Sequence, residues 1–524
     1  MEKDIEKLLE RAIELNPKLA NAHYKLGVLH QSREEFDTSI SYFEQAVHLD
    51  SSFSEAECEL AIELKRQKKF EEARDHFLNA LEINPNFVKA YFNYALLLID
   101  LNDIEEAKNN FDKVAEIDQN YAPAYYYKAR LLTNPDDFEE ARKNYETAID
   151  INEGFIEAHY YLAKLLLGGL ATNNDGSKVD KKDPISSKMH FNKALELDPS
   201  DPKPYYNLAK ILFEEKSLKE AKILLSKALE LMPSYSKAHY LCARIYDLED
   251  NYEKSSFHYN QSISCHNNNP NALFFLGKLQ FNRNDLEEAE KNLRLSIKLD
   301  SQNANSHYYL AKILTKDKDS SLAKKHFYKA LEINPEFANA YFDLAFHSEN
   351  SGDINEAKIH FQKATDVEQN FAEAYFNLAR LSSTPAEYEL AERNFETALE
   401  IKEDFDECHY FLGKLLSKGQ RMNKDGTLVI RPEIERAVKH FREAIRINPD
   451  SYKSHYRLGL LLAEQEYFTK AFDSLQKSIK INPDFADAHY QLAVLLMNQK
   501  ALKEIMKAKK AIHLGKAKSN KAKN

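Results

Sequence analysis

Residues 54–87 read SEAECELAIELKRQKKFEEARDHFLNALEINPNF, and this 34-residue pattern determines the expected fold. Small residues occupy position 8 (Ala61) and position 20 (Ala73) of the pattern. A phenylalanine occupies position 24 (Phe77), and a proline occupies position 32 (Pro85). The apolar residues recur at helical spacing in two runs of about a dozen residues, which a short polar turn separates. The stretch therefore predicts two helices that pack closely against each other.

The same pattern returns along the whole chain at a fixed interval. Position 20 is mostly Ala and sometimes Ser, position 27 is mostly Ala, and Pro recurs at position 32, where it ends the second helix. Position 8 is Gly or Ala in every unit, and the units begin at residues 20, 54, 88, 122, 156, 202, 236, 270, 304, 338, 372, 406, 452 and 486. A fixed period of this size indicates stacked supersecondary units. We therefore expect an all-α α-α superhelix, a solenoid of about 14 helix-turn-helix repeats.

The period, the positions and the residue types together resemble the tetratricopeptide repeat (TPR) family. The resemblance covers nearly the whole chain. It implies a right-handed superhelix of about two turns in which the first helix of each repeat faces a concave groove. It also implies a role in protein–protein interaction, without indicating a particular partner.

The second half of the chain repeats the first at an offset of 250 residues. The motif LEINP at 81–85 returns at 331–335, and Asp175-Gly176 returns as Asp425-Gly426. We interpret this as a tandem duplication of a seven-repeat block. The expected organisation is an N-terminal half-repeat or cap helix (1–19), repeats 1–7 (20–269, with an insertion at 168–184), repeats 8–14 (270–514, with an insertion at 418–432) and a Lys-rich disordered tail (515–524). The first segment fits either a natural cap or a truncated repeat.

The two insertions are predicted to be surface loops, because both carry Asn and Asp-Gly turn signals. They are not predicted to bind calcium. With Gly176 or Gly426 at the sixth position of a calcium loop, its first and twelfth positions lack acidic side chains and are occupied by Ala171 and Lys182, or by Arg421 and Pro432.

Composition restricts the remaining possibilities. The formal net charge is −11, although the C-terminal stretch from Lys503 is rich in lysine. The four cysteines lie far apart without metal or disulfide spacing, and no signal peptide or membrane-length apolar run is present. These features favour a cytoplasmic protein that does not enter a membrane. The sequence carries no phosphate loop, nucleophile elbow or zinc motif, so we predict no cofactor, no metal and no enzymatic activity.

Histidine alternates with tyrosine at position 4 of the repeat. A metal or catalytic site would need these histidines to cluster with carboxylates or thiols. Because they recur at one structural position, we predict half-buried packing residues with a polar edge. The histidines are His23, His159, His239, His307, His409, His455 and His489.

The residues most indicative of binding stand at positions 5 and 9, four residues apart on one face of the first helix. Position 9 is basic in six successive repeats and twice more further along. Its basic members are Arg130, Lys164, Lys210, Arg244, Lys278, Lys312, Arg380 and Lys414. The aromatic residues at position 5 of the same repeats are Tyr126, Tyr160, Tyr206, Tyr240, Phe274, Tyr308, Phe376 and Tyr410. The aromatic rings either pack between helices or line the groove.

A row of like charges in an otherwise acidic protein favours an anionic partner, which would relieve their repulsion. We therefore predict a non-catalytic scaffold or adaptor whose groove binds an acidic or extended peptide segment of a partner protein. The alternative is a regulatory or substrate-recruiting subunit of an enzyme complex, similar to the TPR arrays of protein glycosyltransferases. Those arrays hold peptides with a ladder of asparagines, whereas position 6 here has Asn only at Asn93, Asn207 and Asn377. Nucleic-acid binding is disfavoured by the acidic remainder of the chain. The oligomeric state is not predicted.

Overall fold

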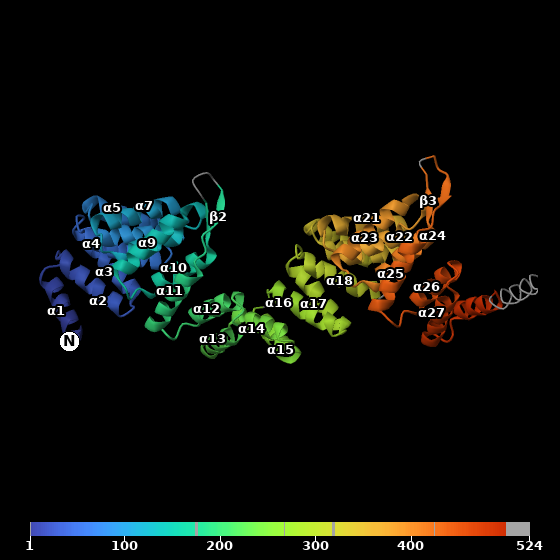
Figure 1. Ribbon diagram of the computed structural model, residues 1–524. Coiled ribbons are helices and arrows are strands. Elements are labelled where there is room, and N and C mark those ends of the chain that lie inside the picture. The colour runs from blue at the N-terminus through green and yellow to red at the C-terminus, as the bar shows by residue number, and fades with distance from the viewer. Residues whose placement is uncertain (1, 173–176, 267, 317–319, 424, 499–524) are drawn as a thin grey trace, which may run out of the picture. The chain divides into compact units, whose positions relative to one another are not determined.

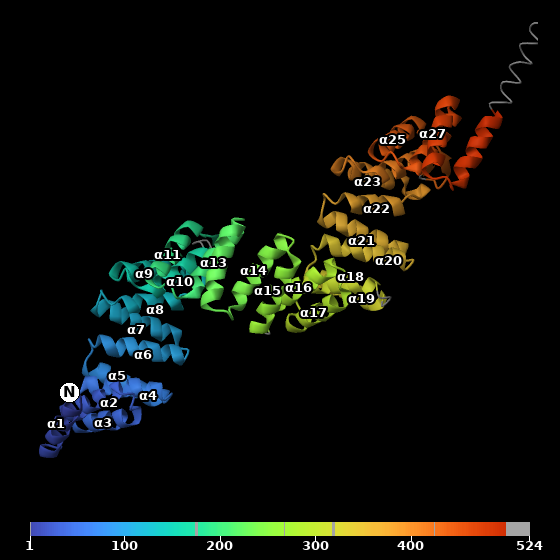
Figure 2. The same ribbon diagram turned by 90° about the horizontal axis from the view of Figure 1, so that it is seen from below.

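The computed structural model describes residues 2–172, 177–266, 268–316, 320–423 and 425–498. The chain forms two compact units, unit 1 (Met1–His266) and unit 2 (Asn267–Asn524). In both units the chain runs through paired helices, stacked one pair after the next (Figures 1 and 2). The predicted tail at 515–524 and the predicted turn at Asp175-Gly176 lie outside the described residues.

Unit 1 begins with the single helix α1 (Glu2–Leu15), which packs on α2. The helix pairs that follow are α2 (Ala20–Ser32) with α3 (Phe36–Leu49), α4 (Ser54–Arg66) with α5 (Phe70–Ile83), α6 (Val88–Asp100) with α7 (Ile104–Ile117), α8 (Ala122–Leu131) with α9 (Phe138–Ile151), α10 (Ile156–Gly168) with α11 (Pro184–Leu197), α12 (Pro202–Glu214) with α13 (Leu218–Leu231), and α14 (Ser236–Leu248) with α15 (Tyr252–Cys265). The short 3₁₀ helix η1 (Pro135–Asp137) joins α8 to α9.

Unit 2 repeats this order. Its helix pairs are α16 (Pro270–Asn282) with α17 (Leu286–Leu299), α18 (Ala304–Lys316) with α19 (Ser320–Ile333), α20 (Ala338–Asn350) with α21 (Ile354–Val367), α22 (Ala372–Leu381) with α23 (Tyr388–Ile401), α24 (Asp406–Lys418) with α25 (Ile434–Ile447), and α26 (Tyr452–Glu464) with α27 (Phe468–Ile481). The 3₁₀ helix η2 (Pro385–Glu387) joins α22 to α23, and a further helix occupies 486–498. The predicted helical-repeat architecture is therefore confirmed.

Each helix pair is held together by position 24 of the second helix against position 8 of the first. A Cβ atom built on Gly27 would lie 2.6 Å from Cε1 of Phe43, and one built on Gly413 would lie 3.1 Å from the ring of Phe441. Both phenylalanine rings are fully buried. At Gly27 even a Cβ atom would overlap the buried ring, and at Gly413 it would make a tight contact, so the close packing at position 8 requires a small residue.

Where position 20 is serine, its hydroxyl group forms a hydrogen bond at the same close contact between the helices. Ser39 Oγ donates a hydrogen bond of 2.9 Å to the carbonyl oxygen of Gly27 at position 8. Equivalent bonds join Ser187 to Ala163 and Ser255 to Ala243. Since an unpaired buried hydroxyl is destabilising, each serine is acceptable here only because the neighbouring helix offers a carbonyl oxygen.

Successive repeats are joined by a second aromatic contact, between position 5 and position 34 of the same repeat. The ring of Tyr126 lies 4.9 Å from that of Phe155, and the ring of Tyr308 lies 4.7 Å from that of Phe337. Phe376 and Phe405 form the matching pair at 4.9 Å. Position 34 precedes the next first helix, so this contact fixes where the next repeat starts.

The two insertions are β-hairpins, so the prediction of simple loops was incomplete. Strands β1 (Leu170–Thr172) and β2 (Lys178–Asp180) pair antiparallel in unit 1, as do β3 (Gln420–Met422) and β4 (Leu428–Ile430) in unit 2. Each hairpin follows a glycine with positive φ, Gly169 or Gly419, where the chain leaves the preceding helix. Strand pairing gives the inserted backbone the hydrogen bonds that a loop would lack.

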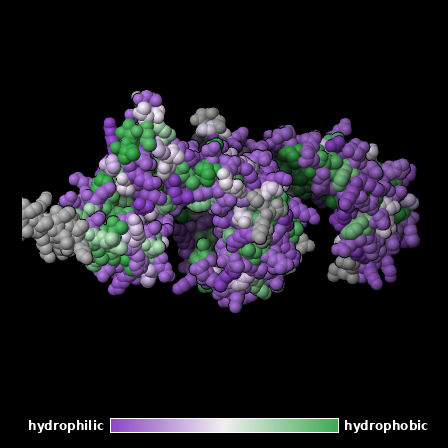
Figure 3. All heavy atoms as spheres, turned by 90° about the vertical axis from the view of Figure 1, so that its right-hand side faces the viewer, coloured by the Kyte–Doolittle hydropathy of each residue, from purple (hydrophilic) through white to green (hydrophobic). Residues whose placement is uncertain are grey.

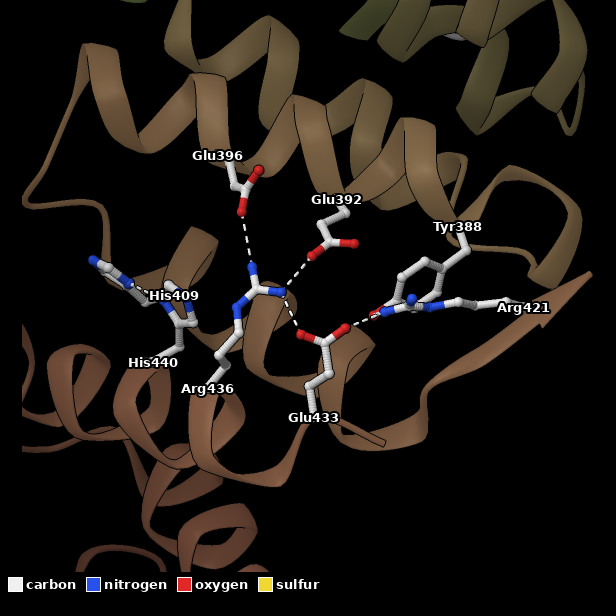
Figure 4. A network of polar contacts seen from close by, with 8 residues as sticks. All are labelled: Tyr388, Glu392, Glu396, His409, Arg421, Glu433, Arg436 and His440. Atoms are coloured by element: carbon white, nitrogen blue, oxygen red, sulfur yellow. Dashed lines mark hydrogen bonds and ion pairs between the residues drawn. The ribbon is translucent and has the colours of Figure 1, made fainter. Parts of the chain in front are cut away.

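The hairpins are anchored differently in the two units. In unit 1 the buried Ala171 packs in one apolar cluster with Phe138. In unit 2 the equivalent residue is Arg421, whose guanidinium lies 4.3 Å from the ring centroid of Tyr388 and forms an ion pair with Glu433. Figure 4 shows the network that continues from there through Arg436, which also bonds Glu392 at 2.7 Å and Glu396 at 2.8 Å.

Outside these contacts the surface is largely polar. The face shown in Figure 3 is mainly hydrophilic, with separate apolar patches. Within the described ranges, every helix is too short or too polar to cross a membrane.

Candidate basic face on the first helices

The helices α8, α10 and α12 of unit 1 each present a basic side chain at position 9. These residues are Arg130, Lys164 and Lys210, and all three are exposed. Among the described residues, none of the three forms an ion pair with a carboxylate. We call this group, together with the exposed Lys203 and Lys237, the basic face of unit 1. Within the ranges that the structure describes, carboxylates do not neutralise the three position 9 cations of this surface.

Aromatic rings position the first two of these cations. The Arg130 guanidinium lies 4.8 Å from the centroid of Tyr161 in the next repeat, and the Lys164 ammonium lies 5.4 Å from the same ring. Tyr126 and Tyr160 lie 5.8 Å below the same two cations from position 5. Such contacts attract a cation to the face of a ring but leave its charge available to a ligand.

The electrostatic state of Lys164 reflects this crowding. Burial lowers the pKa of its ammonium, and the positive charges of three neighbours lower it further: Lys237, Arg130 and Lys203. Each of these effects disfavours the charged form. An anion bound at this place would relieve the repulsion, so the face is better suited to an anionic ligand than to a neutral one.

Unit 2 differs from unit 1 in its ion pairs. Two residues that were predicted to be free cations there are paired with carboxylates. Lys312 forms an ion pair of 2.9 Å with Asp343, and Arg380 forms one of 2.7 Å with Glu349. In each case the carboxylate comes from the first helix of a neighbouring repeat. Two of the eight predicted basic residues are therefore already neutralised.

The other three predicted basic residues are less exposed than those of the basic face, and they contact aromatic rings or lie near other cations. Lys278 is half-buried, with its ammonium 5.9 Å from the ring of Tyr309, and Arg244 lies 3.4 Å from the hydroxyl of Tyr240. Burial lowers the pKa of Lys414, and so do three nearby cations: Lys418, Arg457 and Lys453. Lys414 therefore resembles its counterpart Lys164, although its side chain is less exposed.

The aromatic residues at position 5 serve the packing between helices. Four of the eight predicted binding residues are buried and cannot form an open surface: Tyr126, Phe274, Tyr308 and Phe376. The other four are half-buried: Tyr160, Tyr206, Tyr240 and Tyr410. The prediction that position 5 lines a contact surface is thus corrected for the buried four, because position 34 and the adjacent helices cover their rings.

A pocket of about 330 Å³ opens beside Arg130 and Lys164. Its walls come from the end of α8 and residues 132–134 after it, from α9 and α10, and from strand β1 of the inserted hairpin. Tyr145 and Tyr161 line it together with the two cations, and Leu170 of the hairpin stands at its side. The insertion therefore forms part of the pocket.

The structure also shows four histidine pairs that sequence reasoning missed. The Nδ1 atoms of His159 and His190 lie 3.0 Å apart, and those of His239 and His258 also lie 3.0 Å apart. In unit 2 the pairs His307–His326 and His409–His440 are each separated by 2.9 Å. A second histidine at position 23 accompanies the one at position 4 in these repeats, and this spacing is the signal that could have revealed them.

The hydrogen bonds assign the tautomers of the pairs. Nε2 of His239 lies 3.0 Å from the carbonyl oxygen of Pro233, so it donates the proton, and Nδ1 is left as an acceptor. Nδ1 of His258 must then donate to it. Burial and the partner histidine lower the pKa of His258 to about 4, so the ring of His258 is neutral at pH 7.

The structure offers no obvious catalytic constellation in the ranges that it describes. No cluster of three or more His, Cys, Asp or Glu side chains suited to a metal occurs there. The four cysteines are free, and burial raises the pKa of the thiols of Cys58 and Cys242 to about 12, which disfavours a reactive thiolate.

Sequence models of the tetratricopeptide repeat match the chain at 20–53, 64–131, 122–155, 179–245, 270–303, 304–337, 372–405 and 433–484. These segments together cover more than half of the chain. The chain therefore belongs to the tetratricopeptide repeat family, whose members generally take part in protein–protein interactions and are typically not catalytic.

Several solved structures share this repeat architecture. The chain is 14% identical to Cut9–Hcn1 of the APC/C hetero-tetramer, over 91% of this chain and 96% of that one, with a TM-score of 0.38. It is 22% identical to YrrB, a TPR protein with an unusual peptide-binding site, over 35% and 95% of the two chains, with a TM-score of 0.32. For PilF of Pseudomonas aeruginosa the identity is 19%, the coverage 41% and 98%, and the TM-score 0.38. The search of curated proteins gave no match.

Proposed function

We propose that this chain is a non-catalytic scaffold that binds an acidic, extended segment of a partner protein on the basic face of unit 1. The observation that carries the proposal is the absence of carboxylate partners for Arg130, Lys164 and Lys210 within the described structure. A side chain that is charged, exposed and unpaired keeps its full attraction for an external anion. Long-range attraction to such a face also accelerates association with an acidic partner.

The glycosyltransferase-like alternative receives no support from the asparagines at position 6. The side-chain amide of Asn207 donates to the carbonyl oxygen of Lys203, and that of Asn377 donates to the carbonyl oxygen of Glu373. Asn93 bonds its own helix in the same way. Each of these amides therefore spends one of its two N–H donors within its own helix.

The proposal is tested by affinity capture with the full chain, followed by mass spectrometry. Wild type is compared with the charge-reversal variant R130E/K164E/K210E and with K278E/K312E/R380E, which changes the same position in unit 2. We expect partners with acidic segments to be lost with the first variant and retained with the second. Recovery of the same partners with all three proteins would contradict the proposal.

A further inference from the structure

The pocket beside Arg130 and Lys164 is a distinct feature within the basic face of unit 1. Its two cations come from successive first helices, α8 and α10, and they share the ring of Tyr161 between them. The guanidinium offers a planar fork of donors, and the ammonium offers a mobile point charge. The chain supplies no carboxylate to either of them among its described residues, so the pocket carries an uncompensated charge of about two units.

A tyrosine side chain adds a neutral hydrogen-bond donor to the two cations. Tyr145 is 96% buried (4% exposed) and lines the pocket together with the two cations. Burial raises the pKa of Tyr145, so the phenol stays protonated and can act as a donor.

Unit 2 lacks this combination at the equivalent place. Phe395 and Phe411 stand where unit 1 has Tyr145 and Tyr161, so both hydroxyls are missing. Arg380, the counterpart of Arg130, already holds Glu349 at 2.7 Å. The same fold is therefore present with one of the two cations neutralised and without the two tyrosine hydroxyls, which makes unit 2 an internal control.

We infer that this pocket binds the phosphate group of a phosphorylated side chain on the partner protein, which deepens the proposed function and rests on it. A phosphate monoester carries about −1.5 to −2 charges at pH 7, with three acceptor oxygens. It therefore matches two cations and a phenolic donor. A single carboxylate carries one charge and would leave the second cation without compensation.

The volume agrees with this ligand. A space of about 330 Å³ exceeds what a phosphate group fills, and besides the polar Thr133 and Asn134 the wall has an apolar part that includes Leu132, Leu165 and Leu170. The carbon atoms that link the phosphate to a peptide backbone can pack there. A free phosphate ion would leave this wall unused, which favours the side-chain-borne source.

The test uses isothermal titration calorimetry on the full chain, so no partner has to be known. The probes are one short Gly-Ser peptide in phosphorylated, Glu-substituted and unmodified forms, and inorganic phosphate. We expect the phosphorylated peptide to bind roughly tenfold more tightly than the Glu-substituted form and than inorganic phosphate. R130Q and K164Q should each weaken its binding about tenfold, and Y145F should weaken it less.

The variant R380Q/K414Q is the matched control and should bind the phosphorylated peptide like wild type. Circular dichroism and the melting temperature verify that each variant is folded, and R130K should restore part of the affinity. Equal affinity for the phosphorylated and Glu-substituted peptides, equal affinity for inorganic phosphate, or unchanged binding by R130Q would overturn the inference. If acidic partners are still captured in that case, the proposed function stands without the phosphate pocket.

Discussion

Arg130 and Arg380 occupy the same position in repeats that lie 250 residues apart, yet among the described residues only Arg380 has a carboxylate partner. The partner is Glu349, and the corresponding residue of unit 1 is Ile99. Asp343 also neutralises Lys312, whereas the corresponding residues of unit 1 are the uncharged Asn93 and Ile62. The two units thus share their helices and differ in whether a neighbouring first helix supplies an acid.

A basic residue at position 9 does not by itself define a binding site. Its availability depends on residues one repeat away, on a different helix. Partial neutralisation in unit 2 contributes little stability, because ion pairs near the surface are worth about 0–1 kcal/mol. Its main consequence is to reduce the net field on that face. The two units therefore share one architecture, while the charges at position 9 and around it differ.

The largest expected effect concerns what the two units share. Phe191 and Phe441 occupy position 24 in equivalent repeats, and both are fully buried. We expect Phe191→Ala and Phe441→Ala to destabilise their own units by about 3–5 kcal/mol each, because the cavity cannot collapse between packed helices. Urea denaturation followed by circular dichroism measures this loss. The exposed Ile185→Ala should change stability by less than about 0.5 kcal/mol, and a similar loss there would contradict the packing argument.

Acidification should destabilise both units through the histidine pairs. Burial and the neighbouring histidine lower the pKa values of His326 and His440 to about 4. The unfolded chain binds protons near pH 6.5, so stability is complete above that pH and falls as the pH decreases from about 6.5 to 4. Lowering the pKa of one histidine by 1 changes the free energy of unfolding by about 1.4 kcal/mol.

Chemical denaturation at several pH values measures this dependence. Replacing His326 and His440 by Gln should flatten it, whereas replacing the exposed His48 should leave it unchanged. An unchanged slope in the double variant would show that the pairs do not control acid stability.

A smaller loss of stability is expected when the polar network beside the hairpin of unit 2 is broken, and no such loss is expected at the equivalent position of unit 1. Arg436 bonds Glu392, Glu396 and Glu433, so Arg436→Ala leaves three carboxylates facing each other. We expect a loss of about 1–2 kcal/mol, since the network is only partly buried. Hydrogen exchange should show faster exchange in the hairpin of unit 2. The counterpart Ser186→Ala in unit 1 should change stability by less than about 0.5 kcal/mol, and an equal effect would remove the distinction.

The smallest effect is expected at the turn between the helices of a pair. Asn102 has φ of 63°, and its counterpart Gly352 has φ of 86°. Gly352→Ala should destabilise unit 2 by about 1 kcal/mol, because a Cβ atom is unfavourable in the left-handed region. Asn102→Gly should shift stability by only a few tenths of a kcal/mol. Thermal unfolding compares the two, and a stabilised Gly352→Ala variant would be inconsistent with this geometry.

The sequence predicted the fold because each repeat encodes its own packing. Gly27 and Phe43 lie in one repeat, so their spacing along the chain is enough to infer their contact. The repeat count and the helical class follow from the same local pattern. The hairpins were predicted only as insertions with turns, since three-residue strands give too short an alternation to recognise.

The candidate site was predicted less well because its chemistry depends on contacts between repeats. Nothing local to Arg380 indicates that Glu349 reaches it, and nothing local to Tyr308 indicates that Phe337 covers its ring. The periodic alignment did contain two usable signals: the aromatic residue at position 34 and the histidine at position 23. Both required comparing positions across repeats rather than looking for known motifs.

The central claim is that unit 1 presents free positive charge and unit 2 presents less of it. It is tested most directly by the fluorescence anisotropy of a labelled oligoglutamate peptide, titrated with wild type, R130E/K164E/K210E and K278E/K312E/R380E at increasing NaCl. We predict that the unit 1 variant loses at least about tenfold in affinity and most of the salt dependence, and that the unit 2 variant loses less than about threefold. Equal losses from the two variants, or a larger loss from the unit 2 variant, would contradict the account.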